Sequence, residues 1–248
     1  MVEPMFIAKI SQPVVKGQVV ELTGPEAKHA VSVRRMRVGE PIQLTDTLGL
    51  RIRGNVHGIS GNTLQVEVES AETESAPDLK FTLVQALAKG DRDELAIQAA
   101  TELGISSVIP WESDRSVSRW IGIKETKGVE RWKLIVAEAA KQSLSARFPS
   151  VATPIKGVDI SKIVADFDLV LVLDPTAGTG LGSVSIPDSG SVALVVGPEG
   201  GISEGELEAL AKAGAKRVNL GSPILRTSTA GVAALSAILA LTGQWGSK

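Results

Sequence analysis

Two loops carry the residue types best suited to binding a small ligand. The first, Gly197-Pro198-Glu199-Gly200-Gly201, follows an apolar run at 192–196 and precedes Ser203, where a helix is expected to begin. Glycines in such a turn let backbone N–H groups approach a ligand closely, because no Cβ intervenes. Glu199 would repel a phosphate, so the loop favours a ligand with positive character or with amine donors. The same residues equally suit a tight turn that binds nothing.

The second loop, 220–230, leads from a short strand pattern into the last helix pattern and reads LGSPILRTSTA. Ile224 and Leu225 are apolar where loops are usually polar, which indicates the wall of a pocket. The alternative is that they cover the edge of a sheet. Arg226 places a cation at a helix start, where the helix dipole disfavours it. A cost of this kind is often tolerated for function, so Arg226 is a candidate catalytic residue.

A third glycine-rich segment, Gly178–Ser183, follows an apolar strand pattern and superficially resembles a phosphate-binding loop. It lacks the lysine of a P-loop, and no helix pattern follows it. We interpret it as a flexible connection.

The composition excludes several classes of chemistry. The 248 residues include no cysteine, and the only histidines are His29 and His57. Disulfides, thiolate metal sites, cysteine nucleophiles and a histidine-based zinc site are therefore excluded, and no metal is expected. No run reaches the roughly 18 apolar residues that span a bilayer, and no apolar run follows a basic start. The simplest interpretation is a cytoplasmic protein without a membrane segment.

A basic cluster near the N-terminus indicates an RNA partner, although the formal net charge is only −2. The cluster lies on one expected helix and directly after it, and contains Lys28, His29, Arg34, Arg35 and Arg37. Such a face suits phosphate contacts. A solvated helix face is the alternative, and a lone histidine is more often structural than a ligand contact. With four Phe, four Trp and no Tyr, recognition of RNA shape and phosphates fits better than stacking on bases.

Short strand patterns with turn punctuation fill the first 70 residues and predict a small β-barrel. The expected strands are Met5–Ile10, Gln18–Leu22, Pro41–Thr45, Leu50–Val56 and Thr63–Val68, with one helix over Pro25–Arg35. Ser70–Asp78 is polar, contains a proline and lacks apolar periodicity, so it is the expected linker. This organisation divides the chain into a barrel over 1–74 and a second domain over 75–248.

From Leu79 onward strand patterns alternate with helix patterns, which predicts an α/β domain. Nearly continuous apolar runs at Asp168–Leu173 and Ser191–Val196 are typical of strands buried on both faces of a parallel sheet. The other expected strands are Phe81–Ala88, Ile105–Pro110 and Arg217–Leu220. The expected helices begin at Asp91 and Ser203, each with capping-box spacing to a glutamate, and span Val129–Ala146 and Thr227–Leu241. Ligands of such folds bind at the C-terminal ends of the strands.

Taken together, the two loops resemble the C-terminal signature motifs of the SPOUT methyltransferase superfamily. More narrowly, they resemble the RsmE family, which methylates N3 of a uridine in small-subunit ribosomal RNA. The motifs are GPEGGISEGELE (197–208) and LGSPILRTSTAGVAALSAI (220–238). Further segments agree in order and spacing, so the resemblance spans almost the whole chain: 29–40, 89–92, 98–104, 114–116, 131–132 and 138–143.

The resemblance implies an α/β fold of SPOUT type whose C-terminal end forms a trefoil knot, preceded by a PUA-like β-barrel that binds RNA. It also implies a homodimer that acts on 16S ribosomal RNA, within the 30S subunit, with S-adenosylmethionine bound in the knot. The matching cofactor-site candidates are Leu173, Gly197, Pro198, Glu199, Gly200, Gly201, Leu220, Gly221, Ile224, Leu225 and Ala230. The RNA-binding candidates are His29, Arg34, Arg35, Arg37, Lys89 and Arg92.

Methyl transfer to N3 of uracil requires loss of the N3 proton and stabilisation of the developing anion. Arg226 is the candidate for stabilising that anion, and Arg115 for holding the base or its phosphates. Glu199 and Glu102 are both candidates for the proton acceptor. The chain has Ser228 where the family often has Glu, so an acidic role is not carried over to that position. Two alternatives stay open: a SPOUT enzyme that methylates a ribose 2′-hydroxyl, and an RNA-binding assembly factor without catalysis.

Overall fold

The computed structural model describes residues 3–245, which form two compact units. The first unit consists of the described residues up to Ala76 together with 140–148. The second unit consists of Pro77–Ala139 and the described residues from Pro149 onward.

A five-stranded sheet forms the first unit, in the order β1-β3-β4-β5-β2. Its strands are β1 (Met5–Ile7), β2 (Val19–Leu22), β3 (Pro41–Thr45), β4 (Leu50–Ser60) and β5 (Thr63–Thr73). β4 and β5 form a long antiparallel hairpin, while β1 pairs with β3 in parallel. Inward-facing residues such as Ile52, Leu64 and Val66 build one apolar core. The five strands predicted from the pattern are all present.

Two expectations for the first unit are wrong in detail. The single helix over Pro25–Arg35 is replaced by α1 (Gly24–Lys28) and a wider π-helical turn, η1 (His29–Val33), and Arg35 then adopts φ 55°. The expected linker begins too early, because β5 continues to Thr73 and residues 70–73 remain paired with β4. Side chains 71–73 are exposed, so this end of the strand carries no apolar pattern.

The segment 140–148 completes the first unit, although it follows most of α3 (Ile123–Gln142) in the chain. Thr45 Oγ1 donates to the carbonyl of Ala146 at 2.9 Å. Lys141 Nζ pairs with Glu26 Oε1 at 3.1 Å, and the Lys141 side chain is only 6% exposed. The division expected between 74 and 75 assigned this segment to the second domain. Polar contacts between residues so distant in the chain leave no periodic signal in the sequence.

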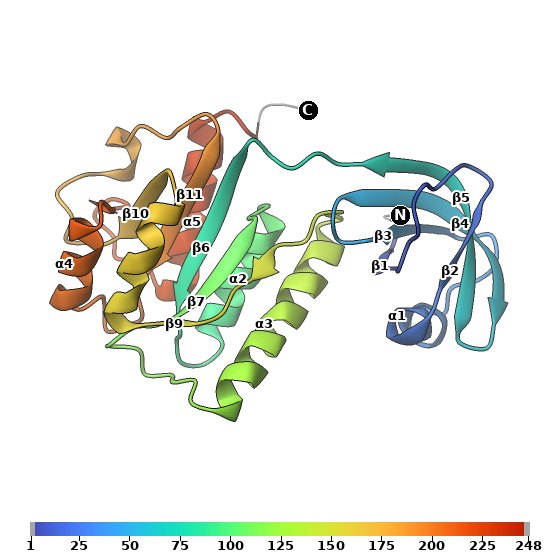
Figure 1. The fold of residues 1–248 in the computed structure, drawn as a ribbon, viewed down its shortest axis with the longest axis horizontal. Helices are drawn as coiled ribbons and strands as arrows, with labels where there is room; N and C mark the ends of the chain where they lie inside the picture. The colour runs from blue at the N-terminus through green and yellow to red at the C-terminus, as the bar shows by residue number, and fades with distance from the viewer. Residues whose placement is uncertain (1–2, 246–248) are drawn as a thin grey trace. The chain divides into compact units, whose positions relative to one another are not determined.

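A parallel seven-stranded sheet forms the second unit (Figure 1), in the order β12-β10-β11-β6-β7-β8 with β9 beside β7. Its strands are β6 (Leu79–Ala86), β7 (Ser107–Glu112), β8 (Ser150–Val151), β9 (Ile155–Lys156), β10 (Leu169–Leu173), β11 (Gly190–Val196) and β12 (Lys216–Val218). Alternate residues of β6, β10 and β11 enter two different apolar cores. The prediction of an α/β unit with a doubly covered parallel sheet is confirmed.

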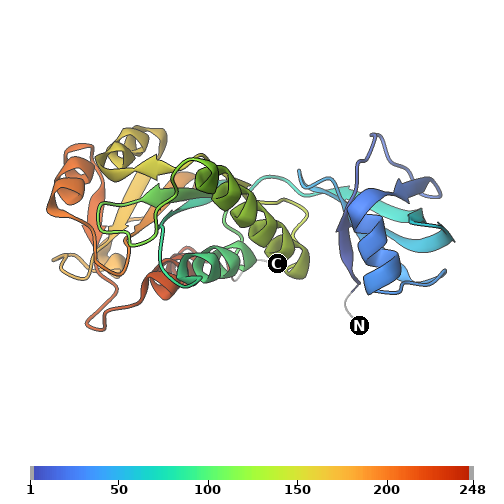
Figure 2. The ribbon, with the colours of Figure 1, turned by 90° about the horizontal axis from the view of Figure 1, so that it is seen from below.

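Helices cover both faces of this sheet (Figure 2). α2 (Arg92–Glu102) and α5 (Thr227–Leu241) lie on one face, and α4 (Glu204–Lys212) and the 3-10 helix η2 (Gly157–Asp166) lie on the other. α3 packs Trp132 and Val136 into the core that α2 and α5 share. α5 has the predicted bounds, whereas α3 begins at Ile123 rather than Val129. The segment 178–183 ends in a short 3-10 turn, η3 (Leu181–Ser183).

The two predicted capping boxes have different outcomes. Ser203 and Glu206 form one at the start of α4, with both reciprocal hydrogen bonds present. Asp91 precedes α2 but has φ 59°, and its side chain makes no capping hydrogen bond. Asp93 instead accepts from the backbone N–H of Ala88 at 3.1 Å. The prediction for Asp91 is wrong because Gly90 and Asp91 are both left-handed, a conformation that a spacing rule does not anticipate.

Candidate functional site

A pocket of about 640 Å³ lies at the C-terminal ends of β10, β11 and β12, a size typical of small-molecule sites. Both loops singled out from the sequence contribute to its wall. Each predicted cofactor residue lines it: Leu173, Gly197, Pro198, Glu199, Gly200, Gly201, Leu220, Gly221, Ile224, Leu225 and Ala230. Arg92, Arg115 and Arg226 line it as well.

The loop after β11 contains positions where a side chain does not fit. A Cβ on Gly197 would lie 2.6 Å from Ile202 Cγ1, and Gly201 takes φ +74°, which side chains rarely tolerate. Thr227 Oγ1 donates to the carbonyl of Gly197 at 2.8 Å and accepts from Gln85 Nε2 at 2.9 Å. Side chains of β6 and α5 therefore fix this loop on the side of the sheet. The backbone groups of the loop that face the pocket stay available to a ligand.

Glu206 ties this loop region to the loop after β7. Its carboxylate is completely buried and accepts from Ser113 Oγ at 3.0 Å and from the backbone N–H of Asp114 at 2.8 Å. Arg115 follows in the same loop, and its Nη1 donates to the carbonyl of Gly200 at 3.3 Å. The capping box of α4 thus also fixes where the Arg115 guanidinium meets the pocket.

Glu199 is held by two donors from the start of α2. Its Oε1 accepts from the backbone N–H of Lys89 at 3.0 Å and from Arg92 Nη1 at 3.0 Å. Burial favours the neutral carboxyl, but hydrogen bonds from its own backbone amide and from Lys89, together with Arg92, outweigh burial and lower the pKa of Glu199. A carboxylate with a lowered pKa is a weak proton acceptor. The geometry favours Glu199 as the residue that anchors the glycine loop.

The loop 220–226 exposes apolar surface within the pocket. Ile224 is 79% exposed and Leu225 is 37% exposed, although both line the cavity. Such side chains are available to cover an apolar or aromatic ligand group. Arg226 is the N-cap residue of α5, and its guanidinium makes no hydrogen bond or ion pair with any residue between 3 and 245. Its charge is therefore available to a bound molecule.

Sequence reasoning missed a polar cluster at the end of β10. Asp174 is 8% exposed and accepts from Arg217 Nε at 2.7 Å and from Thr176 Oγ1 at 2.8 Å. Burial raises the pKa of Asp174, but the hydrogen bonds from Thr176 and Arg217 outweigh burial and lower it. All three residues line the pocket. The only signal in the sequence is a carboxylate that directly follows a buried strand.

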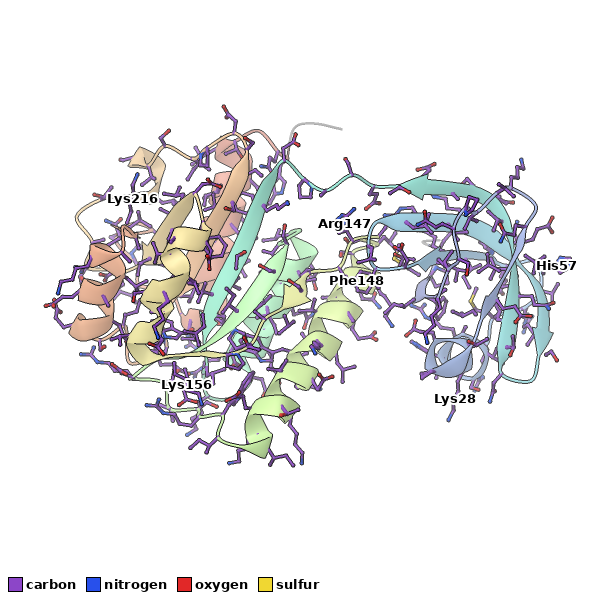
Figure 3. All side chains as sticks on the ribbon, in the orientation of Figure 1. Lys28, His57, Arg147, Phe148, Lys156 and Lys216 are labelled. Carbon is purple, nitrogen blue, oxygen red and sulfur yellow. The ribbon has the colours of Figure 1, made fainter. Side chains whose placement is uncertain are left out.

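The predicted RNA-binding residues fall in both units. Lys89 and Arg92 meet Glu199 in the second unit, whereas His29, Arg34, Arg35 and Arg37 belong to the first. The three arginines are exposed, and Lys28, the last residue of α1, projects from the surface (Figure 3). The ring of His29 makes an edge contact with Phe6, with 5.9 Å between ring centroids, so packing accounts for this histidine.

Residues 3–245 offer neither a metal site nor a membrane span. There, no group of three or more His, Cys, Asp or Glu side chains is placed to hold a metal ion. In the same part of the chain no helix has the length and apolar character needed to cross a membrane.

Comparison with known proteins places this pocket in a family. A model described as RNA methyltransferase domain matches residues 75–239, and one described as RNA methyltransferase PUA domain matches 22–69. The ribosomal RNA small subunit methyltransferase E of Mycobacterium bovis is 41% identical over 92% of this chain and 89% of its own length. The Bacillus subtilis protein of that name is 32% identical over 94% of each chain.

A solved structure agrees with these sequences. The ribosomal RNA small subunit methyltransferase E from Neisseria gonorrhoeae, bound to S-adenosyl methionine, is 29% identical and has a TM-score of 0.85 over 97% of this chain and 98% of its own. The chain belongs to the RsmE family of ribosomal RNA small subunit methyltransferases.

Proposed function

We propose that this protein uses S-adenosylmethionine to methylate N3 of a uridine in the 16S RNA of the small ribosomal subunit. The observation that carries the proposal is the convergence of both signature loops on one pocket at the carboxyl ends of the strands. Two relatives, 41% and 32% identical to this chain, are named ribosomal RNA small subunit methyltransferase E. The match covers nearly the whole length of each. No feature of the pocket favours a non-catalytic role.

The residues of the pocket fit S-adenosylmethionine. Gly197, Gly200 and Gly201 leave their backbone groups accessible, and Ile224 and Leu225 offer apolar cover for a flat ring. Glu199 and Asp174 place carboxylate oxygens in the pocket wall, each paired with an arginine, and these oxygens can accept hydrogen bonds from the amine donors of the cofactor. When bound, the cofactor supplies an electrophilic methyl group on a sulfonium.

The chain's own residues position the acceptor and hold its charge. Uracil must lose the proton on N3, and negative charge then develops on the ring. Arg226, whose guanidinium is free among the described residues, would stabilise that charge. Arg115, which lines the same pocket and contacts the carbonyl of Gly200, would hold the base or its phosphate. Glu199 would keep the glycine loop in place rather than accept the proton.

We also propose that the C-terminal end is threaded as a trefoil knot. Support comes from the segment 218–219, whose one peptide group is hydrogen-bonded on both sides, to Asp174 and to Thr179. Asp174 N donates to the carbonyl of Val218 at 2.9 Å on one side, and Asn219 N donates to the carbonyl of Thr179 at 2.9 Å on the other. The chain then continues into α5, which packs on β11 and β6. Leu181, buried in this region, orders a connection that we expected to be flexible.

Three further expectations belong to this proposal. The exposed arginines of the first unit would bind RNA phosphates, in agreement with the PUA match over part of that unit. The enzyme would act as a homodimer, as the family resemblance implies. It would work in the cytoplasm, where ribosomal subunits are assembled.

Nucleoside analysis of 16S RNA from a strain without this gene tests the proposal. We expect 3-methyluridine to disappear and to return when the gene is restored. Loss of a 2′-O-methyl nucleoside instead would overturn the choice of acceptor atom. Isothermal titration with S-adenosylmethionine provides the second arm, and a folded protein that shows no binding would refute the enzymatic reading.

A further inference from the structure

A second pocket, of about 360 Å³, lies at the N-terminal end of α2 within the second unit. It is lined by Lys89, Gly90, Asp91, Asp93, Glu94, Val117, Trp120, Arg131 and Trp132, among others. Its wall adjoins that of the cofactor pocket, because the backbone N–H of Lys89 donates to Glu199 Oε1 at 3.0 Å. Glu199 lines the larger pocket and Lys89 the smaller one. One layer of hydrogen-bonded groups thus separates the two.

An aromatic platform forms one side of this second pocket. Trp120 and Trp132 meet edge to face, with 5.3 Å between ring centroids, and Trp132 is buried. Trp120 is only partly buried, and its ring lies over Gly128, where an added Cβ would come within 3 Å of three ring atoms. Val117 beside it is 67% exposed. A base could stack on Trp120, and removing such an aromatic partner typically weakens binding by roughly tenfold or more.

Cations at the rim are placed to meet a phosphate. Arg131 uses Nε and Nη2 to bind the two carboxylate oxygens of Glu94, at 3.1 and 2.8 Å. Its Nη1 makes no hydrogen bond to any described residue, and the side chain is 61% exposed. The ammonium of Lys89 likewise has no ion-pair partner within residues 3–245. Because Arg131 is held in one orientation, its free donors are directed before any ligand arrives.

The carboxylates of the pocket suit the edge of a base rather than a phosphate. Asp93 is 6% exposed and uses its oxygens to accept from the backbone N–H groups of Ala88 and Glu94. Asp91 is exposed at the rim. Asp93 therefore holds the backbone of the pocket wall, and the exposed carboxylate of Asp91 is the acceptor available to the imino or amino groups of a nucleobase. The pocket therefore combines a stacking face, base-edge acceptors and phosphate donors.

We propose that this second pocket binds one unpaired nucleotide of the RNA substrate. In the RNA strand this nucleotide is the neighbour of the uridine that receives the methyl group. The base lies against Trp120, and its phosphate meets Arg131 and Lys89. This inference rests on the proposed function, because it assumes that RNA reaches the cofactor pocket. It adds to that function a site that selects a single-stranded neighbour of the target and so helps to draw the target uridine out of any stacked structure.

The test measures methylation of 30S subunits from the gene-deletion strain, with separate titrations of S-adenosylmethionine. Trp120→Ala should raise KM for 30S subunits by about tenfold or more, in line with the loss of one stacked base. Trp120→Phe should recover most of that loss, because a phenyl ring still stacks. Cofactor affinity should stay within about twofold of wild type in both variants, since Trp120 does not line the cofactor pocket.

Arg131 and Glu94 provide a matched pair that separates RNA binding from structure. Arg131→Gln removes both the ion pair and the cation, whereas Glu94→Gln removes the ion pair and keeps the cation. Arg131→Gln should raise KM clearly more than Glu94→Gln, which loses only the fixed orientation of the cation. Arg131→Gln alone should lower the slope of log affinity against log salt by about 0.7, the value for one phosphate on a single strand. Equal effects of both substitutions would mean that the pair is merely structural and would overturn the proposal.

The outcomes distinguish this inference from the proposed function. If wild-type protein does not methylate 30S subunits at all, the proposed function fails. If wild type is active and both Trp120→Ala and Arg131→Gln keep its KM, only the second pocket is refuted. Should Trp120→Ala not fold, the exposed Arg131 side chain still gives the answer.

Discussion

Arg226 and Glu199 carry opposite charges in the wall of one pocket, and they differ in whether neighbouring residues already pair with that charge. Glu199 is satisfied by Lys89 and Arg92, which leaves it little capacity to accept a proton. Arg226 sits at the positive end of a helix with no partner for its guanidinium among residues 3–245. An unpaired cation in an unfavourable position is one that a negatively charged reaction centre would stabilise.

Replacing Arg226 by Ala should therefore reduce the rate of methyl transfer by about 10²–10³-fold, as expected for loss of one group that stabilises developing charge. Cofactor affinity should change by less than about threefold. Single-turnover rates with 30S subunits would show the first effect, and calorimetric titration the second. Arg226→Lys serves as the control and should retain part of the rate, because the charge remains. Unchanged turnover in the alanine variant would remove Arg226 from the mechanism.

Glu199→Gln should weaken cofactor binding by about tenfold, because a neutral amide holds Arg92 and the Lys89 amide less tightly than a carboxylate does. The pH dependence follows from the lowered pKa. A carboxyl whose folded pKa is lowered contributes stability above its ordinary value of 4.5 and loses it only as pH falls through the lower folded value. Wild-type affinity should thus be flat between about pH 5 and 8 as far as this group is concerned.

Titration of both proteins across that range checks the prediction. A drop in wild-type cofactor affinity near pH 6 that Glu199→Gln abolishes would mean that this carboxyl has a raised pKa instead.

At the scale of single residues, the sequence indicated those whose type is unusual for their position. Ile224 and Arg226 stood out because an apolar side chain in a loop and a cation at a helix start are both unusual, whereas Gly197 stood out only together with this second loop. Asp174 and Arg217 did not, because an aspartate after a strand is ordinary and its partner is 43 residues away. Trp120 gave no signal either, because the position of its partly buried ring depends on Gly128 and Trp132, which lie further along the chain.

Among the elements, α4 shows how one helix start serves both stability and the site. Its capping box was predicted from the spacing of Ser203 and Glu206. The sequence did not indicate that Glu206 also accepts from Ser113 and Asp114 of the loop after β7. The spacing rule describes contacts three residues apart, and these partners lie more than 90 positions away.

Glu206→Ala should therefore cost more than a helix cap alone. We expect a loss of about 2–4 kcal/mol in the free energy of unfolding, because it leaves buried donors without partners. Ser203→Ala, which removes the cap but keeps the buried carboxylate, should cost about 1 kcal/mol. Urea denaturation would compare the two. Glu206→Ala should also reduce cofactor affinity through the Arg115 loop, and equal stability losses in the two variants would contradict the cross-linking role.

Strand and helix positions were predicted best where burial dictates the pattern. β10 and β11 are buried on both faces, so continuous apolar runs predicted their bounds with little error. The bounds of α5 were predicted as well, because a loop precedes its apolar run and a glycine follows it. The error over 25–35 has a different cause. There the backbone widens to a π-helical turn around buried Ala30 and then turns at Arg35, and side-chain periodicity does not distinguish such a turn from an α-helix.

For the whole molecule, the division into two parts could be predicted from the sequence pattern alone. Short strand patterns separated by turn residues are followed by strand patterns that alternate with helix patterns. The sequence pattern did not reveal that 140–148 belongs with the first unit. Its membership depends on individual polar contacts, chiefly the pair between Glu26 and Lys141 and the hydrogen bond from Thr45 to Ala146. Contacts of this kind are set by the folded chain and have no local sequence pattern.

The Glu26–Lys141 pair allows a test of that assembly. Lys141→Met should destabilise the first unit by about 3 kcal/mol, because it leaves the Glu26 carboxylate partly buried without its cation. Glu26→Gln keeps an acceptor for the backbone N–H of Ile7 while removing the charge. The double variant should recover much of the stability, because neither charge then remains uncompensated. Thermal and urea denaturation of the three variants would measure this coupling. Strictly additive losses in the double variant would show that this ion pair does not hold 140–148 in the first unit.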